Sequence, residues 1–424
     1  MIGEKIIAAP APKLTPAAKP AFTQKKFIVT LIFVTSLFML WGIAITMGDV
    51  LNRHFQNVLN VSKAQSGLVQ FSIFGAYAIM GIPAGLFMKR FGYKNGVLLG
   101  LSLYAVGAFL FVPASNAGSF LFFRVALFVL ACGLATLETV AHPFVASLGE
   151  ERTSDQRINF AQSFNALGAV VGPLIGGQFI LGGEHSLGSV KLLYIIIGCV
   201  ITAVAVSFAM VKVPAFRDAH SPAAEKDAYA VAANPSAIVH SKKLFQHRHF
   251  IWAAVAQFFN VAAQGGTWAF FINYGHEKMG FTDKTASFYF SLSMVMMMIG
   301  RFAGTYLMRF IAPNKLLAAF AFGSIVMCVI VAQSWGWPSF IALLMINFFF
   351  SIMFPTIFSL GLKDLGPHTQ QGSSFIVMGV VGGALFPYLM GKIANHDVAT
   401  AYYLPIICYF VIFLFGARLY KVKH

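Results

Sequence analysis

The chain has 424 residues, of which 58% are hydrophobic and only 10% are charged, and its mean hydropathy is +0.75. Soluble domains carry about a quarter of their residues as charged ones, so the composition excludes a water-soluble globular protein. The formal net charge of +16 does not indicate a nucleic-acid partner, because the basic residues follow a membrane topology. We expect an integral membrane protein in contact with lipid.

Twelve apolar stretches follow one another along the chain. Each is long enough to cross the hydrocarbon core, which takes about 20 helical residues. The short alternating strands of a β-barrel are not seen. The sequence therefore predicts an all-α fold of twelve transmembrane helices, at about 27–52, 65–88, 95–114, 119–147, 157–182, 190–212, 249–277, 284–310, 314–334, 337–362, 371–393 and 400–420.

One long polar segment divides these spans into six and six. A weak repeat supports the division, since "HPFVASLG" (142–149) resembles "FPTIFSLG" (354–361) at the corresponding place in the second half. Paired six-helix halves are typical of rocking transporters that bind substrate between the halves. The predicted units are a disordered cytoplasmic tail (1–24), a six-helix bundle (25–212), a cytoplasmic linker (213–248) and a second six-helix bundle (249–424).

The basic residues orient the protein in the membrane. With the N-terminus inside, 22 of the 30 Lys and Arg residues fall on the cytoplasmic side and 7 on the other, with Arg301 left within a span. Cytoplasmic loops carry such an excess. We expect a multi-pass protein of a bacterial-type inner (plasma) membrane with both termini in the cytoplasm.

Only two of the fourteen acidic residues lie within the spans, Asp49 in the first and Glu138 in the fourth. Placing a charged side chain at this depth in the membrane costs free energy, and a carboxyl removed from water favours its protonated form. Both are therefore candidates for proton coupling. The alternatives are that Asp49 lies near the outer surface paired with Arg53, one turn on, and that Glu138 has a purely structural role.

Amide side chains and one indole suggest a sugar site. Gln162 and Asn165 share a face of the fifth span, and the seventh span carries a stripe at spacings of three, four and four: Gln257, Asn260, Gln264 and Trp268. Sugar hydroxyls need paired donors and acceptors, and the C–H faces of a sugar pack on aromatic rings. The alternative is that these amides only join helices by hydrogen bonds.

A further residue lies beside the second acid. His142 follows Glu138 by one turn, where it could tune the acid, bind substrate or simply pack as a neutral ring. No phosphate-binding loop, metal-ligand spacing or nucleophile–base pair is found, so we expect no enzyme and no ATP-driven pump. The expected coupling ion is the proton, without a cofactor or a metal.

The chain resembles the fucose permease family of the major facilitator superfamily, which are sugar–proton symporters with twelve helices. The resemblance covers residues 30–420. The segments that carry it are "LFMLWG", the Asp of "MGDVLN", "LETVAHPFV", "RINFAQSFNALGA", "AQFFNVAAQGGTW", "FPTIFSLGLKDLG" and "GSSFIVM".

The resemblance implies that Asp49 and Glu138 take part in proton coupling and sugar binding. It also implies that Gln162 and Asn165 line the sugar cavity, and that Gln257, Gln264 and Trp268 form the facing wall.

Three departures concern the substrate. The family's Asn-Pro reads His142-Pro143, its Tyr-Pro in the tenth helix reads Phe354-Pro355, and "AITMG" replaces the polar residues before the first acid. His142 and Phe354 are therefore counted with the substrate-binding residues.

The sequence predicts a monomeric secondary transporter that imports L-fucose or a related hexose with protons. The alternatives are a proton-independent sugar facilitator and a carrier of another sugar such as glucose, galactose or N-acetylglucosamine. An efflux antiporter for apolar compounds is less compatible with the amide stripe, and a membrane receptor or scaffold would show no counterflow of labelled sugar in vesicles.

Overall fold

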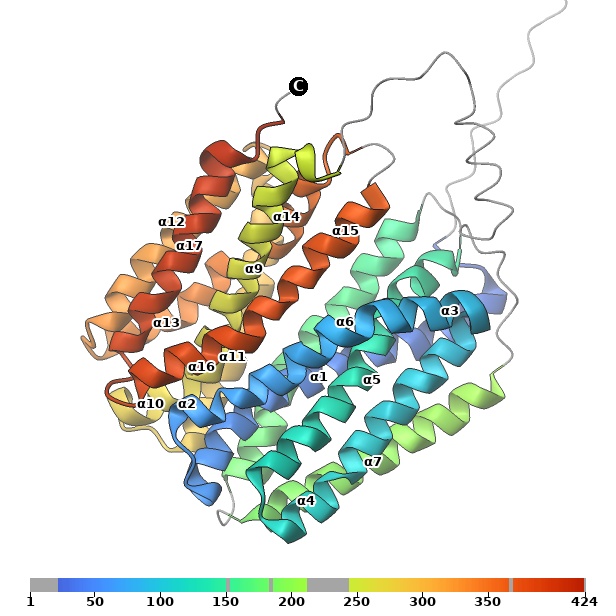
Figure 1. The fold of residues 1–424 in the computed structure, drawn as a ribbon, viewed down its shortest axis with the longest axis horizontal. Coiled ribbons are helices and arrows are strands. Elements are labelled where there is room, and N and C mark those ends of the chain that lie inside the picture. Colours follow the sequence, from blue (N-terminus) through green and yellow to red (C-terminus); the bar gives the residue numbers. More distant parts are fainter. Residues whose placement is uncertain (1–21, 150–152, 183–185, 212–243, 366–368, 423–424) are drawn as a thin grey trace, which may run out of the picture.

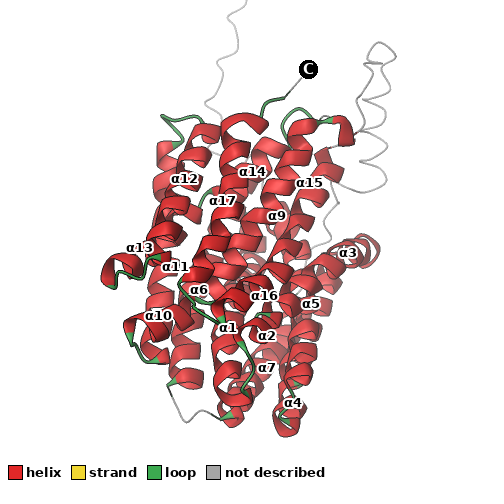
Figure 2. Ribbon diagram, turned by 60° about the vertical axis from the view of Figure 1, so that its left-hand side comes forward, coloured by secondary structure: helices red, strands yellow, loops and turns green. Residues whose placement is uncertain are grey.

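The computed structural model describes residues 22–149, 153–182, 186–211, 244–365 and 369–422. Within these ranges the ordered segments are helices, and no strand occurs (Figure 2). The all-α prediction is confirmed. The predicted tail at 1–24 and linker at 213–248 lie almost wholly outside the described residues.

Two groups of helices lie side by side (Figure 1). The first, in blue to green, comprises α1 (Ile28–Leu59), α2 (Lys63–Ser66), α3 (Leu68–Phe109), α4 (Phe111–Ala117), α5 (Phe120–Ser147), α6 (Ser154–Gly176) and α7 (Leu187–Met210). The second, in yellow to red, comprises α9 (Arg248–Ala269), α10 (Phe271–Met279), α11 (Asp283–Leu307), α12 (Pro313–Ala332), α13 (Trp337–Phe350), α14 (Met353–Gly361), α15 (Thr369–Met378), α16 (Gly382–Ala394) and α17 (Leu404–Leu414).

Eleven helical segments of the described chain are long and apolar enough to cross a membrane. They match eleven of the predicted spans, and α3 supplies two of them, with a break at Gly92, where φ is +79°. The remaining predicted span is α9, a helix of 22 residues. Its amide side chains make it less apolar, but it is about 33 Å long, enough to cross the hydrocarbon core.

The first span extends further than predicted. The expected end was near residue 52, but α1 runs to Leu59 and ends at Asn60, which adopts a left-handed conformation with φ of 53°. The last turns of α1 carry Asn52, Arg53 and Gln56, which are buried or half-buried. These polar residues remain helical because they contact the second group of helices rather than water.

Close packing of α1 against α6 fixes the centre of the first half. A Cβ on Gly42 would lie 2.1 Å from the carbonyl oxygen of Asn165, and a Cβ on Gly168 would lie 2.1 Å from that of Met39. Only glycine leaves room for backbones at this separation. The two helices are therefore held in register where Asn165 lies.

The two halves meet at the end of the bundle opposite the described chain ends. We call this the distal end and define it as residues 52–66, 269–287 and 390–397. Hydrogen bonds between the halves cluster there: Asn52 Nδ2 donates to the Ala269 carbonyl oxygen at 2.8 Å, and Lys63 Nζ donates to that of Ala394 at 2.7 Å. Ser287 Oγ, in the same region, donates to the Pro173 carbonyl oxygen at 2.7 Å. The distal end is closed in this structure.

Candidate functional site

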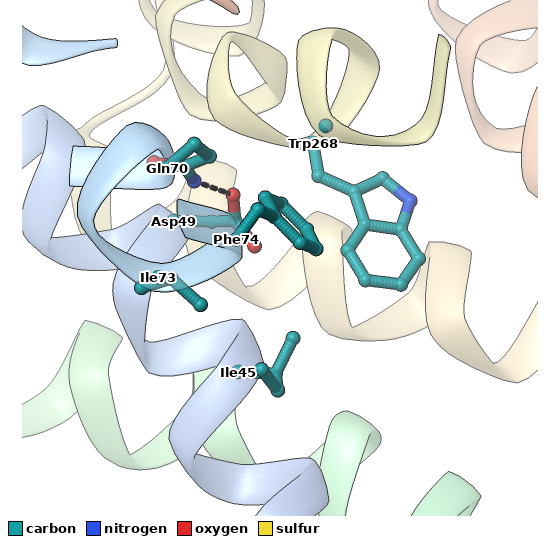
Figure 3. A pocket seen from close by; sticks show the side chains of 7 residues that line it. Ile45, Asp49, Gln70, Ile73, Phe74 and Trp268 are labelled. Atoms are coloured by element: carbon teal, nitrogen blue, oxygen red, sulfur yellow. Dashed lines mark hydrogen bonds between the residues drawn. The ribbon is translucent and has the colours of Figure 1, made fainter. Parts of the chain in front are cut away.

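Asp49 lies in α1, facing the boundary between the two halves. Its side chain is buried, with 3% of its surface exposed, and its Oδ1 accepts a hydrogen bond from Nε2 of Gln70 in α3. These two residues line a small cavity with Phe74 and, from α9 in the second half, Gly265 and Trp268. Figure 3 shows the Phe74 ring between the Asp49 carboxyl and the Trp268 indole. Two predicted site residues, Asp49 and Trp268, therefore share one cavity.

The alternative pairing of Asp49 with Arg53 is wrong. Arg53 Nε instead contacts Oδ1 of Asp283 at 3.0 Å, across the boundary between the halves. Asp49 and Arg53 are one helical turn apart on α1, but the arginine extends toward the distal end. None of the ion pairs in the described part of the chain includes Asp49 or Glu138.

Glu138 lies in α5 and is partly buried. The hydroxyl of Tyr77 in α3 lies beside its carboxyl. The Tyr77 oxygen in turn accepts a hydrogen bond from Nε1 of Trp41 in α1. The second acid thus lies beside a hydrogen-bonded pair of neutral side chains from two other helices.

His142 connects Glu138 to the predicted amides. Its Nδ1 lies 2.9 Å from the backbone oxygen of Glu138, and its Nε2 lies 2.7 Å from Nε2 of Gln162. A carbonyl oxygen only accepts and an amide nitrogen only donates, so both contacts fit a neutral ring protonated on Nδ1. Of the three readings of His142, the geometry fits a neutral ring placed between the acid and Gln162.

Asn165 lies one turn beyond Gln162 on α6, and both residues are half-buried. Its Nδ2 donates to the backbone oxygen of Phe38 at 3.2 Å. The Phe38 ring also meets the His142 ring edge-on, with centroids 5.0 Å apart. Four predicted residues, Glu138, His142, Gln162 and Asn165, therefore belong to one connected cluster around α1, α5 and α6.

The amide stripe of α9 divides into two environments. Gln257 and Asn260 are fully buried, and none of their four side-chain polar atoms has a hydrogen-bond partner among the described residues. Gln264 is half-buried. Trp268 turns its Nε1 away from the cavity and donates to Oδ1 of Asn347 at 2.7 Å, which leaves the indole ring as the cavity wall.

Phe354 lies in α14 and is half-buried. No described ring contact joins it to the other predicted site residues. The structure therefore does not link it to either cluster.

Several residues at the site were missed by the sequence analysis. Gln70 and Tyr77 bind the two acids, Trp41 orients Tyr77, and Asn347 orients Trp268. The only sequence signal for the first two was their spacing of seven residues in the second span, which places them on one helical face. Asn347 is the one amide in the apolar helix α13, which alone does not identify its partner.

Comparisons with known proteins agree with the architecture. The chain matches the family model of the Major Facilitator Superfamily over residues 27–387. It is 37% identical to the L-fucose-proton symporter of Escherichia coli (strain K12), over 94% of both chains. It is 33% identical to the glucose/galactose transporter of Brucella abortus biovar 1 (strain 9-941), over 97% of this chain and 98% of that protein.

The comparison with solved structures gives the same result. The crystal structure of the transporter FucP in the outward conformation is 36% identical to this chain, with a TM-score of 0.66. The match covers 94% of this chain and 100% of that one.

Proposed function

The chain belongs to the major facilitator superfamily and, within it, to the fucose permease family, and we propose that it moves a monosaccharide together with protons by alternating access. As a multi-pass transporter it is not an enzyme. The substrate would bind between the halves, where Asp49 and Trp268 line one cavity.

The observation that carries this proposal is the state of the two acids. Asp49 and Glu138 lie inside spans, each beside a neutral side chain, without a cationic partner among the described ion pairs. An unpaired carboxylate at membrane depth costs about 3 kcal/mol or more, so uptake of a proton stabilises the site. Release of that proton on the other side of the membrane then couples transport to the proton gradient.

The second half supplies groups suited to a sugar. Gln257 and Asn260 are buried amides whose polar atoms lack protein partners, and leaving such an atom unpaired costs about 1–3 kcal/mol. Sugar hydroxyls can donate to and accept from amides, and the Trp268 ring that lines the cavity suits the C–H face of a sugar. An efflux carrier for apolar compounds would gain nothing from these amides.

The charge distribution and the closed distal end together support the assignment of this structure to one state of the transport cycle. We place both termini in the cytoplasm of a bacterial inner membrane, with the distal end outside. The described structure then represents a carrier closed to the outside. In this reading it works as a monomer in lipid, with the proton as its coupling ion and no cofactor.

L-fucose is the first substrate to test, because the 37% identical relative is an L-fucose-proton symporter. A hexose such as glucose or galactose is the second, since a 33% identical relative is a glucose/galactose transporter. Because Phe354 lacks the hydroxyl of the family's tyrosine, an experiment must identify which of these sugars is the substrate. A pocket that hydrogen-bonds hydroxyls discriminates strongly on each one.

The test is uptake of labelled L-fucose, D-glucose and D-galactose into proteoliposomes, with and without an inward proton gradient. We expect the gradient to drive accumulation of one of these sugars, and Glu138→Gln to abolish that accumulation. Asp364→Asn is the matched control, because Asp364 is exposed, lies outside the spans and has φ of 56°, which asparagine tolerates. Undiminished accumulation by Glu138→Gln would contradict the proposal.

A further inference from the structure

Both acids lie against side chains of a single helix, α3. Gln70 donates a hydrogen bond to Asp49, and the Tyr77 hydroxyl lies beside Glu138. The two α3 residues are seven positions apart, so they lie on one face of the helix, about two turns or 10.5 Å from each other. This face of α3 thus touches both elements of the proposed proton machinery.

Tyr77 has a defined direction of donation. The indole of Trp41 is a donor only, so the Tyr77 oxygen accepts from it and the Tyr77 proton is left for Glu138. A hydrogen bond donated to a carboxyl oxygen stabilises the carboxylate more than the acid. The arrangement of Trp41 and Tyr77 therefore favours one protonation state of Glu138 while α3 is in this position.

Gln70 has a different relation to its acid. Its Nε2 donates to Asp49, and its Oε1 is buried without a hydrogen-bond partner in the described part of the chain. An amide turned by 180° would present that oxygen to a protonated Asp49, which then donates. Gln70 can therefore hold Asp49 in place both with and without its proton.

The same face of α3 also contacts the second half of the molecule. Phe74, between Gln70 and Tyr77 on this face, lines the cavity together with Trp268 (Figure 3). It also packs against α16, where a Cβ on Gly383 would lie 2.7 Å from the Phe74 ring. A movement of the second half against the first therefore acts on the helix face that holds both acids.

We propose that Gln70 and Tyr77 are positioning residues that link the proton occupancy of Asp49 and Glu138 to the position of the second half through α3. This inference rests on the proposed function, because it assumes that the two acids exchange protons during transport. The proposal assigns the link between proton occupancy and the position of the second half to α3, and not to α1 and α5, which carry the acids.

The test uses the full-length protein in proteoliposomes, with L-fucose counterflow measured from pH 5 to 10 and with gradient-driven uptake. In Tyr77→Phe the midpoint of the counterflow pH profile should move about one to two units to higher pH, because a donor to a charged acceptor is lost. In Gln70→Leu gradient-driven accumulation relative to counterflow should fall at least about fivefold. Introduced together with Glu138→Gln, Tyr77→Phe should cause no further change, because the two residues act as a unit.

Ser72→Ala is the matched control. Ser72 is on another face of α3, is buried, and donates only to the backbone oxygen of Leu68 within its own helix. It should leave the pH profile and the accumulation ratio as in the unmodified protein. If Tyr77→Phe is not recovered in folded form, Trp41→Phe tests the same chain, with a shift in the same direction of less than about one unit.

The outcomes separate the two proposals. Loss of accumulation in Glu138→Gln with an unshifted profile in Tyr77→Phe and Trp41→Phe overturns the positioning role and leaves proton symport intact. An unaltered accumulation ratio in Gln70→Leu overturns the part assigned to Gln70. Normal accumulation in Glu138→Gln removes the proposed function itself.

Discussion

Neutralising Asp283 should open the distal end. This carboxylate is buried at the contact between the halves and accepts hydrogen bonds from Arg53 Nε at 3.0 Å and Asn57 Nδ2 at 2.6 Å. His276 Nδ1, from the same half as Asp283, lies 3.0 Å from Oδ1. Both Arg53 and Asn57 come from the first half, so this one side chain makes two of the hydrogen bonds that hold the halves together at the distal end.

The size of the effect follows from the loss of the charged pair. Asp283→Asn keeps a polar group beside Asn57 but removes the charge that Arg53 faces. A hydrogen bond to a charged group contributes about 1.5–3 kcal/mol, which corresponds to about a ten- to hundredfold change in the ratio of closed to open molecules. Closure should not vanish, because Lys63 still bridges to Glu277 at 2.8 Å and to the Ala394 carbonyl.

The assay is a distance measurement between spin labels on exposed distal positions of the two halves, Asn60 and His396, by pulsed electron resonance. The exposed Cys199 is first replaced by serine, since the other three cysteines are buried. We expect Asp283→Asn and Arg53→Gln to add a population at longer distance.

Lys278→Gln is the control, because Lys278 pairs with Asp397 at 2.5 Å within the second half and joins nothing to the first. Unchanged distance distributions in both Asp283→Asn and Arg53→Gln would refute the reasoning. So would an equal opening in Lys278→Gln.

Two stability predictions follow from other parts of the structure. Burial raises the pKa of Asp397, but hydrogen bonds, first of all from Lys278, outweigh it and hold the pKa well below its usual range. A carboxyl whose pKa is lowered in the folded state stabilises the protein at pH values above its unfolded pKa, near 4. At pH 7 Asp397→Asn should therefore melt at a lower temperature than the unmodified protein, and this difference should shrink as the pH falls below about 4. A deficit independent of pH would contradict this assignment. Gly168→Ala should destabilise by about 1–3 kcal/mol, because its Cβ would lie 2.1 Å from a backbone oxygen of α1. Gly81→Ala should not destabilise the protein, because no atom lies within 4 Å of a Cβ at this position. Equal melting temperatures of the two variants would exclude the clash at Gly168.

The membrane spans could be predicted because hydropathy is a local property. The first helix continues beyond the predicted span end near residue 52, through Asn52, Arg53 and Gln56. Their partners are Ala269, Asp283 and Asn273, more than 200 residues away in the chain, and contact with these partners keeps the polar turns of α1 helical. No local pattern contains that information.

The candidate site was predictable in part for a similar reason. A carboxyl group in an apolar span is conspicuous, so Asp49 and Glu138 could be singled out from composition and position. Gln70 and Tyr77 are ordinary residues for a transmembrane helix, and only the packing of α3 against α1 and α5 brings them to the acids. Sequence thus identifies groups that are costly to bury, whereas their partners depend on the tertiary arrangement.

The position of Asp49 imposes an order on the proposed cycle. Along α1, Asp49 is followed within one turn by Asn52 and Arg53, which bind the second half at the closed distal end. Only 3% of Asp49 is exposed while these contacts hold. If the distal end faces outside, a proton from the outer medium reaches Asp49 only after the contact of Arg53 with Asp283 has broken. Opening of the distal end therefore precedes proton loading, and a carrier that loaded its proton first would need a water path to Asp49 around these contacts.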